Sequence, residues 1–286
     1  MKFDMHVHTQ ASDGELAAMP LFQRAKQKKL DGLAITDHDT LAGLADAQIA
    51  ADCLGMGLIP GVEISTQCSA SIHILGYGVS PKDERLLSFL EKFRKKKRQR
   101  IAHILEMLHG IGFELSMDEV GDADNENLGR PHVARAIVKR GWAADKDEAF
   151  NNYLVKGKPA YVPREKAGTS EAIQMLAGSG AVPVLAHPGL IHMTEQELLT
   201  NIDAWITDGL LGIEAFHPAH TEVQCRYWQD FAVSKGLLVT AGSDFHEVEP
   251  GKLHGELGEM LEKWTNADDH LKMLIQHMQN SNKVYA

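Results

Sequence analysis

Histidines and carboxylates recur in this sequence at or near the ends of short apolar segments. His6 and His8 end the first segment two residues apart, so in an extended strand both side chains point to the same face. Asp13 lies in the loop that follows and can reach the same place. Similar side chains follow or lie within the later segments: His38, Glu63, His73, His187, His217, Asp244 and His246.

The chemistry of these side chains indicates a cluster of metal ions. Imidazole nitrogen and carboxylate oxygen suit zinc, manganese and iron better than copper(I) or calcium. A single histidine after a strand is more often hydrogen-bonded than a ligand, and His-x-His alone is a weak signal. The joint pattern is much more specific, and it offers more groups than one tetrahedral ion can use. It therefore predicts two or three ions.

Short apolar segments predict the strands that would position these residues: 3–8, 33–36, 58–62, 71–77, 182–186, 212–216 and 237–241. Helical stretches at 16–29 and 41–55 come between them. Alternating strands and helices predict an α/β fold with a mostly parallel sheet, and about seven strands favour a closed or distorted barrel. The segments between 58 and 77 break the alternation, which predicts an irregular barrel. The carboxyl ends of parallel barrel strands meet at one mouth.

Residues from about 81 to 165 have a different, mainly helical character, with Leu86, Leu90, Phe93, Ile101 and Leu108 near helical spacing. We expect domain boundaries that give a barrel of residues 1–80 and 166–286 and an inserted helical, substrate-binding subdomain of residues 81–165.

Local signals predict where several helices begin. Capping boxes occur at Ser116 with Glu119 and at Thr194 with Glu197, the second opening a helix to about residue 207. Ser170 is expected to cap a helix that ends near Gly178.

The composition excludes several classes of protein. The chain has 286 residues, of which 44% are hydrophobic and 24% charged, so it can fold around a core. A formal net charge of -10 makes non-specific nucleic-acid binding unfavourable. We find no signal peptide or membrane-spanning run, and we read Cys53, Cys68 and Cys225 as reduced thiols, so a cytoplasmic location is expected. No stable protein partner is evident.

One basic run stands out, with seven basic residues between Lys92 and Arg100. Such a run on a helix is usually a solvated face. The alternative is a contact surface for a short oligonucleotide.

Seven short motifs carry the candidate residues: His6-Val7-His8-Thr9, Ser12-Asp13-Gly14, Thr36-Asp37-His38, Pro60-Gly61-Val62-Glu63, His73-Ile74-Leu75-Gly76-Tyr77, His187-Pro188 and Gly242-Ser243-Asp244-Phe245-His246. In combination they resemble the PHP (polymerase and histidinol phosphatase) family over nearly the whole chain. The residues within these motifs are similar to those of the subgroup of nucleoside 3′,5′-bisphosphate phosphatases, whose relatives include ribonuclease AM. The resemblance implies a distorted (β/α)7 barrel and a three-metal centre, often of manganese, with zinc, iron or magnesium as alternatives.

The resemblance also implies a ligand set. A first ion would be held by His6, His8, Glu63 and Asp244. A second would be held by Glu63, His73 and His187, with Glu63 bridging the two. A third would be held by Asp13, His38 and His246. Many family members have histidine in place of Asp13, and we expect the aspartate to lower the affinity of the third site or to change its metal. Asp13, His38, Glu63 and His246 are also expected to take part in catalysis.

These ligands imply hydrolysis of a phosphate ester. Three ions offset by three carboxylates leave a charge of about +3, which attracts a phosphate dianion. A water between two ions loses a proton near neutral pH, and the resulting hydroxide attacks phosphorus. Arginine binds phosphate in a bidentate way. By the resemblance, the expected substrate contacts are Arg130, His132, Arg135, Lys158 and His217.

The favoured substrate is a nucleoside 3′,5′-bisphosphate that loses its 3′-phosphate, with 5′-to-3′ trimming of short RNA as a possible extension. A phosphatase for histidinol phosphate or another small phosphomonoester shares the same chemistry and stays open. A non-catalytic metal-binding module, like the PHP domains attached to polymerases, is a third interpretation.

Overall fold

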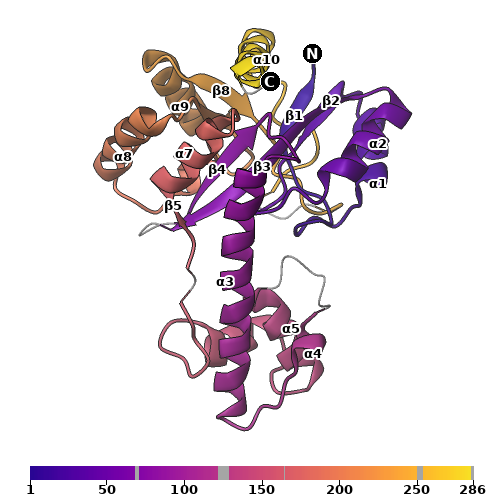
Figure 1. The fold of residues 1–286 in the computed structure, drawn as a ribbon, viewed down its shortest axis with the longest axis vertical. Helices are drawn as coiled ribbons and strands as arrows, with labels where there is room; N and C mark the ends of the chain where they lie inside the picture. Colours follow the sequence, from indigo (N-terminus) through magenta and orange to yellow (C-terminus); the bar gives the residue numbers. More distant parts are fainter. Residues whose placement is uncertain (68–70, 122–128, 164, 250–253, 285–286) are drawn as a thin grey trace. The chain divides into compact units, whose positions relative to one another are not determined.

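The computed structural model describes residues 1–67, 71–121, 129–163, 165–249 and 254–284. The chain divides into two compact units, the first formed by Met1–Phe89 with Ala167–Ala286 and the second by Leu90–Lys166 (Figure 1). The segment expected at 81–165 corresponds in position to the second unit, which begins inside helix α3 (Glu84–His109).

A barrel-shaped sheet forms the first unit. In the described residues its path runs β1-β2-β3-β4-β6-β7-β8, and the short β5 (Ala167–Gly168) pairs with β3 off this path. A bridge between Val7 and Phe245 links the end of β1 to the chain after β8, so the sheet is nearly closed. The strands on this path are β1 (Phe3–Val7), β2 (Gly32–Ile35), β3 (Gly57–Gln67), β4 (Ser71–Tyr77), β6 (Val182–Leu185), β7 (Gly212–Phe216) and β8 (Leu238–Ala241).

The barrel is distorted at β4. This strand pairs antiparallel with both β3 and β6, whereas β1, β2 and β3 pair in parallel, as do β6, β7 and β8. Only three positions of the sequence lie between the end of β3 and the start of β4, too few for the crossover that a parallel pair needs, so β4 returns antiparallel. The predicted distorted α/β barrel is confirmed.

The strands of the barrel are apolar because helices cover the outside of the sheet. Every residue of β2 and β6 is buried, the pattern expected of strands with both faces covered. The helices of this unit are α1 (Ala18–Gln27), α2 (Leu44–Leu54), α7 (Thr169–Gly178), the short η2 (Pro188–Leu190), α8 (Glu195–Asp208), α9 (Glu222–Ser234) and α10 (Ala267–Val284).

Helix starts follow the sequence at Ser116, which caps α4 (Met117–Val120), and at Thr194, and they depart from it at Ser170. Thr194 caps α8 as predicted, and its side chain accepts a hydrogen bond from the backbone of Glu197. The predicted cap at Ser170 is wrong, because the cap of α7 is Gly168, two residues earlier in the chain. The reason is β5, whose pairing with β3 fixes the extended backbone up to Gly168.

The second unit has a small core of its own. It contains most of α3, together with α4 (Met117–Val120), α5 (Arg130–Lys139), α6 (Lys146–Ala149) and η1 (Phe150–Leu154). Pro131 stands in the first turn of α5, where its missing N–H costs nothing. The core residues of this unit are Ile101, Ile104, Leu105, Leu108, Val120, Val133, Ala134, Ala136, Ile137, Ala143, Ala149, Leu154 and Ala160.

Part of the basic run on α3 is engaged within the protein. Arg94 and Lys95 pair with Glu91, and Lys96 pairs with Glu165. Arg100 is buried and donates to the carbonyl of Val162 at 2.8 Å. The run is therefore not a uniformly solvated face.

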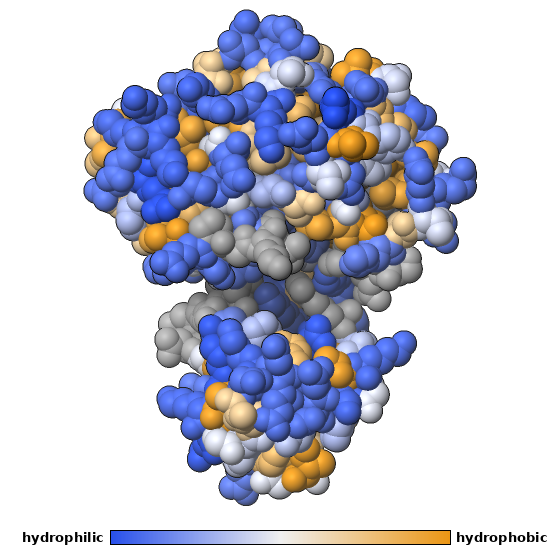
Figure 2. Space-filling view, turned by 180° about the vertical axis from the view of Figure 1, so that it is seen from behind, coloured by the Kyte–Doolittle hydropathy of each residue, from blue (hydrophilic) through white to orange (hydrophobic). Residues whose placement is uncertain are grey.

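Hydrophilic side chains predominate on the face drawn in Figure 2, with smaller scattered hydrophobic areas. None of the helices in the described residues combines the length and the apolar character that crossing a membrane requires. Cys53 and Cys225 are free thiols, and Cys68 lies outside the described residues. The cytoplasmic location stays a prediction.

Candidate metal centre

The predicted ligands from the barrel strands come together in the first unit. His6 lies in β1 and His8 directly after it, and both are fully buried. Glu63 lies inside β3 rather than after it, because β3 extends to Gln67 and pairs Glu63 with Leu75 of β4. The other candidates follow β2, β6 and β8 or lie in β4: His38, His73, His187, Asp244 and His246.

The most buried group joins His6, His8, Glu63 and Asp244, whose candidate ligand atoms all lie within 4.8 Å of one another. His6 Nε2 is 3.3 Å from Glu63 Oε2 and 3.1 Å from Asp244 Oδ1. His8 Nε2 is 3.2 Å from each of the same two oxygens. Two nitrogens and two oxygens thus surround one point, and these are the residues assigned to the first ion.

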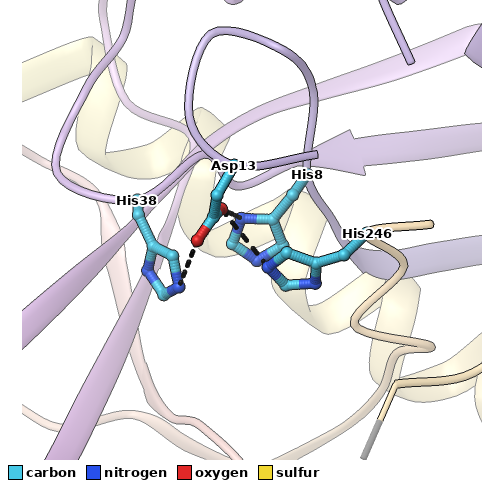
Figure 3. A group of neighbouring side chains, drawn as sticks. All are labelled: His8, Asp13, His38 and His246. Atoms are coloured by element: carbon cyan, nitrogen blue, oxygen red, sulfur yellow. Dashed lines mark ion pairs between the residues drawn. The ribbon is translucent and has the colours of Figure 1, made fainter. Parts of the chain in front are cut away.

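A second group lies around Asp13, and its side chains point toward one another (Figure 3). Asp13 Oδ1 is 3.3 Å from His246 Nε2 and 3.6 Å from His8 Nδ1. On its other side, Asp13 Oδ2 is 3.9 Å from His38 Nε2. This group contains the residues assigned to the third ion, with His8 in addition.

Glu63 connects these residues to a further group. Its Oε1 is 2.8 Å from His73 Nδ1 and 3.1 Å from His187 Nε2. Its Oε2, which faces His6 and His8, is also 2.9 Å from His38 Nδ1. The set that could hold an ion here is His38, Glu63 and His73. The sequence assigned His187 in place of His38, and His187 lies close to Glu63 without belonging to that set.

Unpartnered polar atoms show that this constellation fits metal ions. Among the described residues, His38 Nδ1, Glu63 Oε2 and Asp244 Oδ1 are buried and make no hydrogen bond, although other candidate ligand atoms lie close to each of them. Buried polar atoms without partners are rare in folded proteins because they lose their hydration. Nitrogen lone pairs and carboxylate oxygens that face a shared point are satisfied by a cation between them.

The acids and histidines of these groups shift one another's pKa values. Burial alone would lower the pKa of His8, but Asp244 and Glu63 outweigh it and raise this pKa to about 10. Burial would raise the pKa values of Glu63 and Asp244, but the surrounding histidines hold both well below their usual range. The pKa of Asp13 is also lowered against burial, chiefly by His38. The carboxylates are therefore ionised, as ligands must be.

Neighbouring groups orient several of the histidine rings. His246 Nδ1 lies 2.8 Å from the carbonyl oxygen of Asp244, which can only accept, so its Nε2 is left as the free lone pair. His217 has the opposite arrangement, because its Nδ1 accepts from the backbone N–H of Ala219. Its Nε2 therefore carries a proton and lies 3.4 Å from Asp244 Oδ2. His217 orients Asp244 rather than offering a lone pair.

The loop that carries Asp13 is held by a buried aspartate, Asp37. Its carboxylate accepts from the backbone and hydroxyl of Thr9, each at 2.7 Å, and from the hydroxyl of Ser12 at 2.6 Å. Gly43 packs so closely against this carboxylate that an added Cβ would collide with it. Asp37 belongs to the Thr36-Asp37-His38 motif, but its part in holding the loop of Asp13 is seen only in the structure.

Sequence reasoning missed three further residues near the centre. Glu214 in β7 is buried between His6 and the backbone of His187. His220 donates to the carbonyl of Ala215 and accepts from Gly189. His254 stacks on His246 with ring centroids 4.1 Å apart. A carboxylate at a buried position of an apolar strand was the available signal for Glu214, whereas the other two offered none.

The remaining predicted substrate contacts lie in the second unit. Arg130 donates to the carbonyl of Leu154 at 3.2 Å. The Nδ1 of His132 accepts from the backbone of Gly129 and so caps α5. Arg135 and Lys158 are exposed.

Comparison with known proteins agrees with this geometry. A "5′-3′ exoribonuclease" from Haemophilus influenzae is 33% identical, covering 86% of this chain and 90% of the relative. A "3′,5′-nucleoside bisphosphate phosphatase" from Chromobacterium violaceum is 32% identical, covering 87% and 88%. Both names denote hydrolases that act on phosphoester bonds.

The fold of the chain is also similar to that of a solved structure. A solved structure from Bifidobacterium adolescentis, described as a metal-dependent phosphoesterase, superposes with a TM-score of 0.78 at 31% identity and covers 96% of each chain. The PHP domain matches residues 4–285. The chain therefore belongs to the PHP domain family.

Proposed function

We propose that this protein is a metal-dependent phosphoesterase that removes the 3′-phosphate of nucleoside 3′,5′-bisphosphates. The observation that carries the proposal is the convergence of buried histidines on Glu63, whose two oxygens face different ligand groups. The relative from C. violaceum, named for this reaction and 32% identical, supports the substrate.

The donor set suits two or three divalent ions, with manganese favoured and zinc, iron or magnesium as alternatives. His6, His8, Glu63 and Asp244 would hold one ion, and Asp13, His38 and His246 another. A further ion would lie between Glu63, His73 and the adjoining His187 or His38. When bound, such ions polarise phosphoryl oxygens, lower the pKa of water and neutralise a leaving alkoxide.

The chain's own residues determine how phosphate and its leaving group would be received. His217 presents a protonated Nε2 beside Asp244, which keeps that carboxylate directed at His6 and His8. The side chain of Asp13 is 53% exposed, so the group around it opens to solvent, whereas the group around His6 is closed. Substrate would thus approach from the side of Asp13.

The second phosphate of a bisphosphate requires cations that the described residues around Glu63 do not supply, since they are histidines and acids. By the family resemblance, Arg135 and Lys158, which are both exposed, are the proposed contacts for that phosphate. Arg130 and His132 already hold backbone groups and would contribute their remaining donors.

Exoribonuclease activity on short RNA is a second candidate function. The relative from H. influenzae, 33% identical over most of both chains, carries that name. The same metal-assisted hydrolysis would then act on a phosphodiester.

A phosphate-release panel tests these proposals. The protein, loaded with manganese, is given adenosine 3′,5′-bisphosphate, 3′-AMP, 5′-AMP, histidinol phosphate and a short 5′-phosphorylated RNA, and the products are separated. We expect the bisphosphate to give the highest kcat/KM, with 5′-AMP as its product. Preference for histidinol phosphate would contradict the proposed substrate, and no hydrolysis of any of these compounds would favour a non-catalytic module.

A further inference from the structure

Glu214 is a buried acid that contacts two different candidate ligands. It lies in β7 and is fully buried, and each of its two carboxylate oxygens contacts a different candidate ligand. Its Oε1 is 3.0 Å from Nδ1 of His6, and its Oε2 accepts the backbone N–H of His187 at 2.9 Å. We propose that Glu214 is a positioning residue that sets the tautomer of His6 and the backbone of His187 for metal binding. This inference rests on the proposed function.

The contact with His6 determines which of its nitrogens is free. A carboxylate can only accept, so the proton of the neutral ring must lie on Nδ1. The lone pair of Nε2 then faces Asp244 Oδ1 at 3.1 Å and Glu63 Oε2 at 3.3 Å. A proton on Nε2 would block ligation, so Glu214, by holding the proton on Nδ1, keeps the Nε2 lone pair free for the ion.

The contact with His187 holds a strained turn. His187 has φ 28° and ψ 60°, a backbone conformation that residues with a Cβ rarely adopt. Its N–H is bound by Glu214, and two residues later the N–H of Gly189 donates to His220 at 3.0 Å. The turn is therefore fixed at both ends, with His187 Nε2 3.1 Å from Glu63 Oε1.

The space for Glu214 depends on a glycine. A Cβ at Gly242 would lie 2.8 Å from Glu214 Oε1 and would collide with His6. Only a residue without a side chain lets the segment after β8 pass beside this pair. The glycine of the Gly-Ser-Asp motif thus makes room for the contact that orients His6.

Replacement of Glu214 by glutamine separates positioning from simple packing. The amide has nearly the same shape, but only one of its two ends can accept. If its NH₂ faces His6, Nδ1 must accept and the proton moves to Nε2. If its NH₂ faces His187, two donors oppose each other and the turn loses its anchor. Either way, one candidate ligand is disturbed while the volume is unchanged.

The control is Thr169→Val, which removes a different buried hydrogen bond of the same unit, between Thr169 and Thr66 at 2.9 Å. This bond has no contact with the candidate ligands. A second variant, Glu214→Asp, keeps the charge but is too short to reach both neighbours, and it serves if Glu214→Gln does not fold.

The experiment measures zinc and cobalt(II) affinity by competition, the visible absorption of bound cobalt, and the side-chain ¹H–¹⁵N correlations of His6 in the zinc-loaded protein. We expect Glu214→Gln or Glu214→Asp to weaken metal binding by about 10- to 100-fold, in the range for residues that orient ligands, and to change the cobalt spectrum. Wild type and Thr169→Val should bind alike, with His6 protonated on Nδ1.

Two results would overturn the inference, and only one of them would also overturn the proposed function. If the Glu214 variants kept wild-type affinity and spectrum, the positioning role would be wrong while the proposed function stood. If the wild type bound no divalent metal, both the role and the proposed function would fail.

Discussion

At the scale of single residues, Glu63 is the centre of the account. It is only 1% exposed, yet five candidate ligand histidines approach its two oxygens: His6, His8 and His38 at Oε2, and His73 and His187 at Oε1. Without metal, the surrounding histidines hold the pKa of Glu63 well below its usual range. Bound metal ions would supply positive charge to the same buried carboxylate.

Glu63→Gln should therefore lose metal from more than one position. The amide keeps the shape but presents one oxygen and one NH₂, so it cannot bridge. We expect elemental analysis to show at least one ion fewer per chain. Loss of a residue that only orients a ligand lowers activity by up to about 100-fold, and we expect kcat of this variant to fall by more than that. Unchanged metal content in this variant would contradict the bridging role.

His220 gives a prediction about pH and stability. Burial lowers its pKa to about 4, below the ordinary value of 6.5. The unfolded chain therefore binds a proton more readily, so the stability that neutral His220 contributes is complete above about pH 6.5 and is lost as the pH falls toward 4. The expected loss between pH 7.5 and 5 is about 2 kcal/mol in the free energy of unfolding.

His220→Gln cannot titrate and is the matched comparison. Urea unfolding of the metal-free proteins at pH 7.5 and 5 should show a smaller pH effect in the variant by about this amount. Contributions from groups that do not interact with His220 cancel between the two proteins. Equal pH effects in the two proteins would show that His220 is not held neutral.

Most candidate ligands were predictable from the sequence because they stand in a recognisable strand or shortly after one. His6 and His8 alternate at the end of one strand, His187 comes soon after another, and His38 and Asp244 each come three residues after a strand. Glu214 could not be given its role, because its partners are 208 and 27 residues away in the chain. His254 could not be predicted because no strand pattern leads to it.

At the scale of elements, loops after the strands decide which side chains reach the centre. The loop after β1 is tied to the loop after β2 through Asp37, which binds Thr9 and Ser12 and so places Asp13. Strands β1 to β4 and β6 to β8 were expected at nearly the observed positions. The sequence did not predict β5, α9 or α10, since two residues of strand carry no pattern and neither helix was recognised beforehand.

Gly43→Ala tests this link between loops. The added methyl would collide with Asp37 Oδ2 and lie 2.8 Å from Thr9 Oγ1. Overpacking of this kind costs about 1–3 kcal/mol, and here we expect it to displace Asp13 and weaken the group around it. Metal titration should show one weakened site, with the group around His6 and Asp244 retained.

The control is Gly178→Ala at the end of α7, where an added methyl meets nothing within 4 Å. It should bind metal as the wild type does. If Gly43→Ala also left all sites unchanged, the Asp37 link would not position Asp13.

A residue of helix α5, Arg135, is proposed to bind the second phosphate of the substrate. Arg135 is exposed on this helix, as is Lys139 one turn later. We expect Arg135→Ala to raise KM for adenosine 3′,5′-bisphosphate several-fold more than KM for 3′-AMP, because only the bisphosphate has a phosphate beyond the one that is cleaved. Lys139→Ala should affect neither substrate. Equal increases for both substrates would remove Arg135 from the proposed site.

At the scale of the whole molecule, a barrel brings together candidate ligands that are up to 240 positions apart in the numbering, from His6 to His246. The fold class followed from the alternation of apolar segments and helices, and the family followed from the motifs. The substrate contacts of the second unit did not follow from the sequence, because exposed arginines and lysines look alike wherever they lie. They stay predictions.

The most direct test of the central claim is to titrate manganese into metal-free protein and to follow bound metal and phosphate release from adenosine 3′,5′-bisphosphate in the same samples. We expect no turnover without metal and a rate that rises in step with the second or third bound ion per chain. Full turnover in metal-free protein, or saturation with metal without any release of phosphate, would contradict it.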